Sequence, residues 1–160
     1  MAQTNQAEGK EKGSDKTALE KALAACDALI TYVPLRTEVR FEDYFPLPEG
    51  KTIYQIAPRA ALDPFAEAKN AIAAVGDKKT AVLMPGRAFD AAGTRFGQGG
   101  GWYDRFLSAV PTEWLRIGFC FDRQFSPTPL QREEWDQVMD YVCVAHGQEL
   151  EVFETKGRMV

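Results

Sequence analysis

The stretch Gly93-Thr-Arg-Phe-Gly-Gln-Gly-Gly-Gly-Trp-Tyr-Asp104 decides how the chain around it folds. It holds five glycines, and glycine lets a backbone turn freely because it has no Cβ. The apolar segment Thr80–Met84 precedes it and reads as a buried strand. Residues Trp102–Ala109, at its end, read as a helix. A strand, a glycine-rich loop and a helix in succession are the local unit of an α/β protein.

The same glycines predict a phosphate site at the start of the helix. Gly97, Gly99 and Gly101 let the backbone approach a ligand, and the N–H groups at a helix N-terminus favour negative charge. Asp104 falls in the first turn, where it would repel a phosphate unless a cation such as Mg²⁺ lay between them. A tight strand-to-helix crossover explains the glycines equally well. The pattern is neither a Walker loop nor a dinucleotide fingerprint, because Trp102 stands where the last glycine would be.

Composition sets the class of protein. The chain has 160 residues, 45% of them hydrophobic and 26% charged, with a net charge of −4. We expect one α/β domain over residues 14–160 and a disordered polar tail over residues 1–13. The negative charge argues against a broad nucleic-acid surface, although a local basic pocket stays possible. No segment has the apolar length of a membrane span or a signal peptide, so we expect a cytoplasmic protein.

The cysteines and the single histidine limit the kinds of metal site and catalytic unit that the chain can form. Cys26, Cys120 and Cys143 are far apart, and Cys120 and Cys143 lie in apolar runs typical of buried strands. We therefore expect reduced thiols and no zinc site. His146 is the only histidine and sits near a strand end, which disfavours a Ser-His-Asp or Cys-His catalytic unit.

The rest of the chain alternates between helical and strand patterns. We expect helices over 16–26, 64–75 and 102–109, strands over 28–33, 51–57, 80–84, 115–121 and 138–144, and an edge strand over 151–153. Such alternation indicates a three-layer, mostly parallel sheet flanked by helices. A polar loop follows the first strand, and open α/β sheets bind ligands at that end. Arg36 and Glu38 are therefore candidate site residues, although a solvated loop explains them as well.

A longer match then becomes visible. The segment Met84–Leu107 reads Met-Pro-Gly-Arg-Ala-Phe-Asp, continues through the glycine loop and ends in Trp-Tyr-Asp-Arg-Phe-Leu. It closely resembles the signature of the 5-formyltetrahydrofolate cyclo-ligase (methenyltetrahydrofolate synthetase) family. Ile117–Gln124, Pro129–Asp140 and Tyr32–Val39 are similar to three further segments of that family. The resemblance covers roughly residues 25–145 and is strongest after residue 82.

The resemblance implies a fold and an activity. The fold is a three-layer α/β sheet of the NagB/RpiA/CoA-transferase-like kind. The activity is the conversion of 5-formyltetrahydrofolate to 5,10-methenyltetrahydrofolate with ATP and Mg²⁺, releasing ADP and phosphate. The implied partners are a reduced folate and ATP, with no nucleic acid or membrane, for a cytoplasmic monomer or weak dimer.

The resemblance also implies site residues. Arg95 and Tyr103 would be catalytic, Asp104 and Asp136 would hold the metal, and Glu38 would contact the folate. The implied ATP site comprises Arg95, Gly97, Gln98, Gly99, Gly100, Gly101, Trp102 and Tyr103. The implied folate site comprises Glu38, Gly99, Gly101 and Trp102.

The chain also departs from the family pattern. The family's basic Lys-x-x-x-Arg helix has no counterpart at the expected distance before Glu38, and Trp135 stands where histidine is usual. Trp102 and Trp135 could pack on the pterin or fill the core. One alternative function is therefore a degenerate member that binds nucleotide or folate without turnover. A non-catalytic, RNA-linked module is a third, and the net charge of −4 counts against it.

Overall fold

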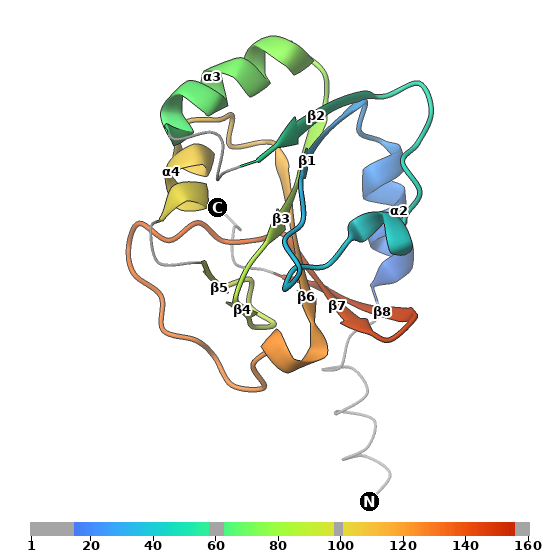
Figure 1. The fold of residues 1–160 in the computed structure, drawn as a ribbon, viewed down its shortest axis with the longest axis vertical. Coiled ribbons are helices and arrows are strands. Elements are labelled where there is room, and N and C mark those ends of the chain that lie inside the picture. The colour runs from blue at the N-terminus through green and yellow to red at the C-terminus, as the bar shows by residue number, and fades with distance from the viewer. Residues whose placement is uncertain (1–14, 58–62, 98–100, 156–160) are drawn as a thin grey trace, which may run out of the picture.

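A six-stranded sheet forms the centre of the molecule (Figure 1). The computed structural model describes residues 15–57, 63–97 and 101–155, so the expected tail over 1–13 lies outside the described residues. The strands are β1 (Ala28–Tyr32), β2 (Thr52–Ile56), β3 (Thr80–Pro85), β6 (Leu115–Phe121), β7 (Tyr141–His146) and β8 (Glu149–Glu154). Their order is β2-β1-β3-β6-β7-β8. All neighbours pair in parallel except β7 and β8, which confirms the mostly parallel sheet.

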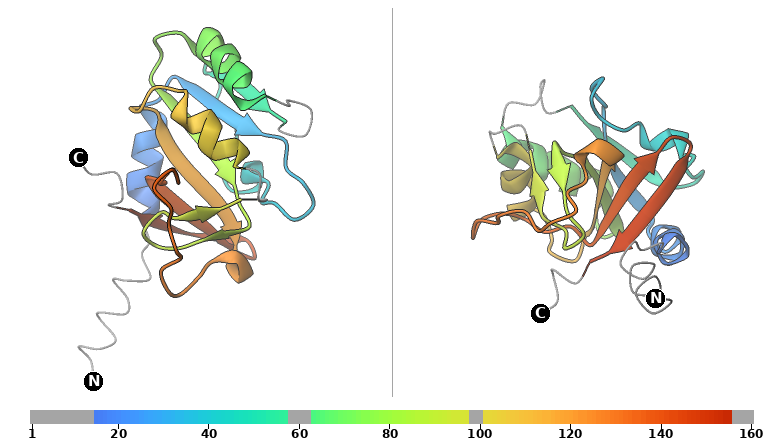
Figure 2. Two further views of the ribbon diagram at one scale, coloured as in Figure 1. Left: turned by 90° about the vertical axis from the view of Figure 1, so that its left-hand side faces the viewer. Right: turned by 90° about the horizontal axis from the view of Figure 1, so that it is seen from below.

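Helices cover both faces of the sheet (Figure 2). Helix α2 (Lys16–Ala24) and the short 3₁₀ helix η1 (Phe41–Asp43) lie on one face, while α3 (Pro64–Val75) and α4 (Trp102–Ser108) lie on the other. A second 3₁₀ turn, η2 (Asp122–Gln124), follows β6. Each face has its own apolar cluster, so the sheet is buried on both sides as apolar parallel strands require.

The helix ends follow from a few residues. The Asp63 carboxylate accepts a hydrogen bond from Phe65 N at 2.9 Å, Pro64 occupies the first turn, and Gly76 ends α3 with φ 61°. Phe65 lies outside the buried face of α3 and is 49% exposed, whereas Pro64, Ala68, Ala71 and Val75 are buried. At the start of α2, Asp15 caps no helix N–H; its carboxylate accepts from Glu154 N at 2.8 Å and ties the helix to β8.

Two predicted features differ in the structure. The fifth parallel strand begins at Tyr141 instead of Val138, because Met139 N donates to Gly93 O and Asp140 N donates to Arg116 O, outside the β6–β7 register. The edge strand is longer than expected, as β8 pairs with the whole of β7. The hairpin of β4 (Ala88–Phe89) and β5 (Arg95–Phe96) was not predicted.

This hairpin is locked onto the sheet by Phe89. The ring is fully buried, as expected for a core residue, and it lies over Gly86 and Gly118. A Cβ at Gly118 would overlap the ring, and one at Gly86 would stand 2.8 Å from it. The hairpin can therefore pack against the sheet because Gly86, just after β3, and Gly118 of β6 leave room for the ring.

The strand order creates a switch point between β1 and β3. From β1 the chain moves to β2 on one side, whereas from β3 it moves to β6 on the other. Loops that leave neighbouring strands in opposite directions open a crevice at their carboxyl ends, which is where open α/β sheets bind ligands. The loop after β1 carries Glu38, and the hairpin after β3 carries Arg95. The topology thus brings two predicted site residues to one place.

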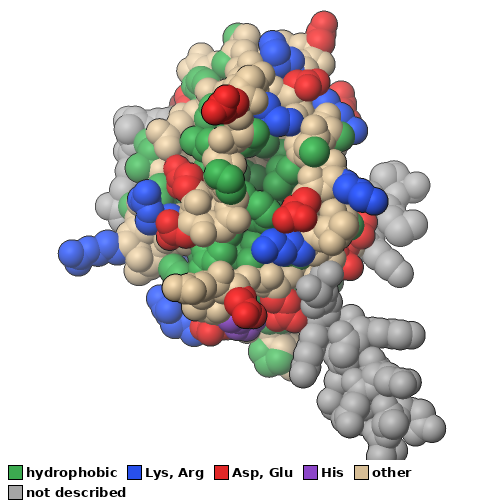
Figure 3. All heavy atoms as spheres, turned by 90° about the vertical axis from the view of Figure 1, so that its right-hand side faces the viewer, with side chains coloured by type: hydrophobic (Ala, Val, Ile, Leu, Met, Phe, Trp, Pro, Cys, Tyr) green, Lys and Arg blue, Asp and Glu red, His purple; other side chains and the backbone are tan. Residues whose placement is uncertain are grey.

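The face that carries α2 and η1 shows apolar side chains gathered near its centre, with charged ones around them (Figure 3). Leu19 of α2 and Phe41 of η1 are buried in the apolar cluster beneath this face. Among the described residues, no helix has the length and apolar character needed to cross a membrane.

Candidate functional site

Arg95 is anchored at the end of β3. Its side chain is 6% exposed, and Nε donates to Pro85 O at 2.6 Å. The guanidinium carbon lies 4.7 Å from the centre of the Tyr103 ring, a cation–π distance. Burial lowers the pKa of Arg95, and the groups that oppose this are, in order, Tyr103, Asp104, Glu38 and Asp136. The other four predicted catalytic, metal and folate residues are thus near enough to Arg95 to act on its charge.

The Tyr103 hydroxyl has no hydrogen-bond partner among the described residues. The residue is 6% exposed, and its hydroxyl oxygen is buried. Burial raises the pKa of this hydroxyl, Arg95 opposes the rise, and Glu38 adds to it. A buried hydroxyl that makes no hydrogen bond is costly unless a ligand supplies the partner. The hydroxyl is therefore a candidate hydrogen-bonding contact for a ligand oxygen or nitrogen.

Glu38 is fixed by its own loop. Its Oε1 accepts from Leu35 N at 2.9 Å, which closes the turn after β1. The neighbouring Thr37 O accepts from Gln124 Nε2 at 3.4 Å, so η2 supports the same loop. The charge of Glu38 also raises the pKa of Tyr32 at the end of β1, after the larger effects of burial and Tyr103. Glu38 therefore holds a carboxylate beside the switch point.

Asp104 and Asp136 come together from segments 32 residues apart in the sequence. Asp104 Oδ1 accepts from the main chain of Gln137 at 3.1 Å, and Asp136 Oδ2 accepts from Glu133 N at 2.8 Å. Burial raises the pKa of Asp104, the Gln137 N–H and Arg95 lower it, and Asp136 raises it. The two carboxylates are thus close enough to repel each other, an arrangement that favours a bound cation.

Two carboxylates fit a magnesium ion whose other ligands are phosphate oxygens and water. Within the described residues, no group of three or more His, Cys, Asp or Glu side chains could hold a metal by itself. Asp104 and Asp136 could therefore hold Mg²⁺ only together with a phosphate-bearing ligand.

The glycine loop is described only at its two ends. Gln98, Gly99 and Gly100 lie outside the described residues. At one end, a Cβ at Gly97 would stand 3.0 Å from an Arg95 guanidinium nitrogen. At the other, Gly101 caps α4 with φ 68°, a conformation that favours glycine. Glycine at 97 thus leaves room for the Arg95 guanidinium, and glycine at 101 suits the left-handed backbone conformation.

The two tryptophans that the sequence left open differ in environment. Trp102 packs against the core and stacks on Phe106, with ring centres 5.5 Å apart and 12° between planes. It also meets Tyr103 edge-on at 5.2 Å, so it supports the catalytic candidate. Trp135 is 67% exposed beside Asp136 and does not fill the core.

Asp90 holds the site's outer segment in place. Oδ1 accepts from Ala92 N and Thr94 N at 3.0 and 2.9 Å, and Oδ2 accepts from Leu130 N at 2.7 Å. Gly93, with φ 93°, then packs against Met139 O, where a Cβ would stand 2.5 Å away. These contacts fasten the crossover between β6 and β7 to the hairpin at Leu130 and Met139, on either side of Asp136 in the sequence.

Sequence reasoning missed Asp90, Arg116 and Gln137. Arg116 was a lone charged residue within the apolar strand pattern Leu-Arg-Ile-Gly-Phe-Cys-Phe, at a position that alternation places in the interior. This charged residue in an otherwise apolar strand pattern was the sequence signal that could have identified Arg116 as a site residue. Gln137 gave none, because its contribution comes from its main-chain N–H.

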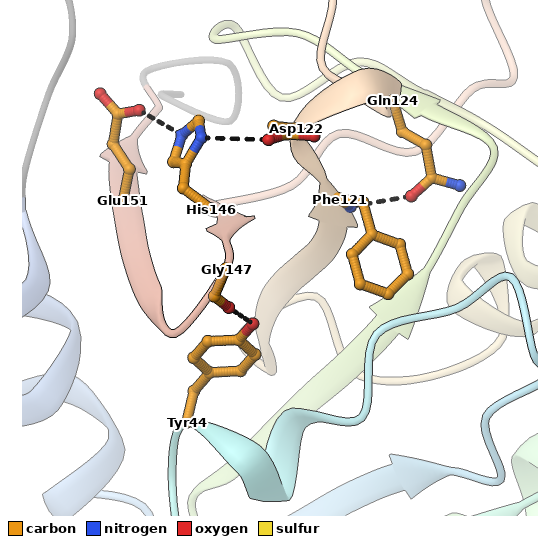
Figure 4. Close-up of polar contacts among 7 residues, drawn as sticks. All are labelled: Tyr44, Phe121, Asp122, Gln124, His146, Gly147 and Glu151. Carbon is orange, nitrogen blue, oxygen red and sulfur yellow. Dashed lines mark hydrogen bonds and ion pairs between the residues drawn. The ribbon is translucent and has the colours of Figure 1, made fainter.

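His146 belongs to a separate cluster at the end of β7 (Figure 4). Its ring lies between Asp122 and Glu151, with Nδ1–Oδ2 3.6 Å and Nε2–Oε1 3.0 Å. The Tyr44 hydroxyl donates to Gly147 O at 2.6 Å in the same region. These contacts join η1, η2 and the β7–β8 hairpin.

The fold is that of an α/β protein with a mostly parallel sheet, and the candidate ligand site lies at its switch point. Its sequence matches the 5-formyltetrahydrofolate cyclo-ligase family over residues 57–145, and the chain belongs to that family. A 5-formyltetrahydrofolate cyclo-ligase from Mycoplasma genitalium is 35% identical over 60 residues, which are 38% of this chain and 35% of that protein. The match thus spans about a third of the curated relative.

A solved structure gives the same fold. The 5,10-methenyltetrahydrofolate synthetase from Mycoplasma pneumoniae aligns with a TM-score of 0.53 and 20% sequence identity. The alignment covers 82% of this chain and 83% of that one, so the similarity extends over most of both folds.

Proposed function

We propose that this chain converts 5-formyltetrahydrofolate to 5,10-methenyltetrahydrofolate in a reaction that consumes ATP and requires Mg²⁺. Membership of the family supports the class of reaction. The observation that carries the proposal is Tyr103, whose buried hydroxyl has no hydrogen-bond partner in the described part of the chain and whose ring lies against the Arg95 guanidinium. A buried donor next to a buried cation suits a ligand that carries both phosphate and polar ring atoms.

The chemistry proceeds in two steps. The formyl oxygen attacks the γ-phosphorus of ATP, and the bond to ADP breaks. N10 of the folate then attacks the activated carbon, phosphate leaves with the former formyl oxygen, and the N10 proton ends on phosphate. Phosphoryl transfer of this kind needs positioning and charge neutralisation more than a protein nucleophile.

Each site residue has a task in this proposal. Arg95 places a fixed positive charge beside the transferring phosphoryl group, and Tyr103 donates a hydrogen bond to a ligand oxygen. The Glu38 carboxylate accepts from N–H groups of the pterin. Asp104 and Asp136 would hold Mg²⁺, which neutralises phosphate charge when bound. The ATP contacts that the resemblance implies also include Gly97, Gln98, Gly99, Gly100, Gly101 and Trp102. Of these residues, Gly99, Gly101 and Trp102 would also contact the folate.

The test is a direct assay of the full chain. Purified protein is incubated with 5-formyltetrahydrofolate, ATP and MgCl₂, and the absorbance of the methenyl product is followed. We expect product only when all three are present. Asp104→Asn should abolish turnover while the far-ultraviolet circular dichroism stays unchanged. The matched control, Glu113→Gln, removes an exposed carboxylate and should retain wild-type activity.

The opposite result has a defined meaning. If no product forms but ATP or 5-formyltetrahydrofolate still raises the melting temperature, the chain binds its ligands without turnover. That outcome would reject the enzyme and support the degenerate binding protein. Full activity in Asp104→Asn would reject the assignment of the metal carboxylate instead.

A further inference from the structure

Arg116 is a charged residue in the interior of the sheet. It is the second residue of β6, and its side chain is 3% exposed. A buried guanidinium is costly unless it is hydrogen-bonded and its charge is compensated. Nη1 donates to Gln137 Oε1 at 2.6 Å. The side chain therefore reaches out of the sheet to the crossover segment that lies over α4.

Gln137 connects Arg116 to the proposed metal site. While its side chain accepts from Arg116, its main-chain N–H donates to Asp104 Oδ1 at 3.1 Å. One residue thus joins a central strand to the first turn of α4. The positive charge of Arg116 is also among the groups that lower the pKa of Asp104, after the Gln137 N–H and Arg95.

We propose that Arg116 is a positioning residue for the metal–nucleotide site, acting through Gln137 on the carboxylate of Asp104. The inference rests on the proposed function. Holding the Gln137 side chain keeps its peptide N–H aimed at Oδ1, so the Asp104 carboxylate keeps one orientation. Groups that orient a metal-binding carboxylate in this way raise metal affinity, and their loss typically weakens it about 10- to 100-fold.

The structure separates this role from simple attachment of β6 to β7. The attachment uses the main chain of Arg116, whose N–H donates to Asp140 Oδ2 at 2.9 Å and whose carbonyl accepts from Asp140 N at 2.8 Å. Replacing the Arg116 side chain leaves those two hydrogen bonds in place. A substitution at Arg116 or Gln137 therefore tests the side-chain link and not the strand junction.

The experiment measures Mg²⁺ dependence without turnover. The full chain is held at fixed ATP, without folate, while MgCl₂ is titrated and the melting temperature is recorded. We expect the Mg²⁺ concentration for half of the shift to rise about 10- to 100-fold in Arg116→Met and in Gln137→Leu. Gln137→Glu keeps the acceptor oxygen and should stay close to wild type. Cys120→Ala, a buried change in the same strand, should lower the starting melting temperature without altering Mg²⁺ dependence.

The outcomes are distinct. Wild-type Mg²⁺ dependence in both Arg116→Met and Gln137→Leu would overturn the inference while leaving the proposed function intact. A wild-type protein with no Mg²⁺-dependent response to ATP would overturn the proposed function and, with it, this role of Arg116. If Arg116→Met does not fold, the contrast between Gln137→Leu and Gln137→Glu decides, because the two differ in the acceptor that Arg116 requires.

Discussion

At the scale of single residues, two groups of the candidate site are unfavourable for the stability of the free protein. Asp104 is a partly buried carboxylate near Asp136, and the buried hydroxyl of Tyr103 finds no hydrogen-bond partner within residues 15–57, 63–97 and 101–155. Neither arrangement stabilises the free protein. Both would become favourable if a ligand brought a cation and a hydrogen-bond acceptor. Binding sites commonly lower the stability of the free protein in this way.

This cost predicts the effect of Asp104→Asn on stability. Because the folded-state pKa of Asp104 is raised, the group's contribution to stability is full below the unfolded pKa. That contribution is lost as the pH rises through the folded pKa. At neutral pH and without Mg²⁺, Asp104→Asn should therefore be more stable than wild type, and the difference should vanish in acid. Urea unfolding in EDTA, at several pH values between about 3 and 8, measures this difference in stability, because carboxyl groups titrate within that range.

Two comparisons make that measurement decisive. Glu113→Gln, at an exposed position, should change the free energy of unfolding by no more than about 0.5 kcal/mol at any pH. Equal stability of Asp104→Asn and wild type at neutral pH would show that the Gln137 N–H and Arg95 fully offset the burial of the carboxylate.

At the scale of elements, the β4–β5 hairpin depends on one fit between ring and glycine. Phe89 projects from β4 onto Gly118 of β6, and Asp90 beside it binds three main-chain N–H groups. The hairpin carries Arg95 in its second strand. Packing at Gly118 therefore sets where the guanidinium lies relative to Tyr103.

We expect Gly118→Ala to destabilise the protein by about 1–3 kcal/mol, because the new methyl group overlaps the Phe89 ring. Phe89→Leu should also destabilise it, through lost contacts and a cavity. In the double variant, the smaller side chain makes room for the methyl group, so the loss should be less than the sum. Urea unfolding of the four proteins measures this coupling, and strictly additive losses would contradict the packing argument.

The sequence predicted the regular elements better than the contacts between them. Thr80–Met84 and Leu115–Phe121 were found as strands because apolar residues run through their length. The β4 and β5 strands have two residues each and so show no periodicity. Val138 resembled the start of a strand, but its neighbours pair with Gly93 and Arg116, which are distant in sequence. A pattern along the chain does not record such pairings.

The same limit applies to the site. The glycine loop and Asp104 formed one continuous motif, and the polar loop after the first strand made Glu38 a candidate. The family resemblance gave Glu38 a folate role and added Asp136. What the sequence did not contain was the link from Arg116 through Gln137 to Asp104, since one of its two hydrogen bonds uses a main-chain donor. Every residue has such a donor except proline, so residue type does not reveal its use.

At the scale of the whole molecule, the alkylation rates of the three cysteine thiols show in which order the helices and the sheet unfold. All three cysteines are at most 1% exposed, and burial raises the pKa of Cys120 to about 12. Cys120 and Cys143 lie in the central strands β6 and β7, whereas Cys26 lies just after α2. Buried, protonated thiols react with alkylating reagents only after the structure around them opens.

We expect helix α2 to separate from the sheet before the central strands unfold. Helix α2 is held at its C-terminal end by Lys51, whose Nζ donates to the carbonyl groups of Leu23, Ala24 and Cys26. We expect Lys51→Met to speed alkylation of Cys26 by iodoacetamide at low denaturant and to leave Cys120 and Cys143 unchanged, because α2 can then leave the sheet before the central strands separate. Peptide mass spectrometry assigns each thiol, and Lys79→Met serves as a control that removes a nearby positive charge. Equal acceleration at all three cysteines would instead mean that α2 and the sheet unfold as one cooperative unit.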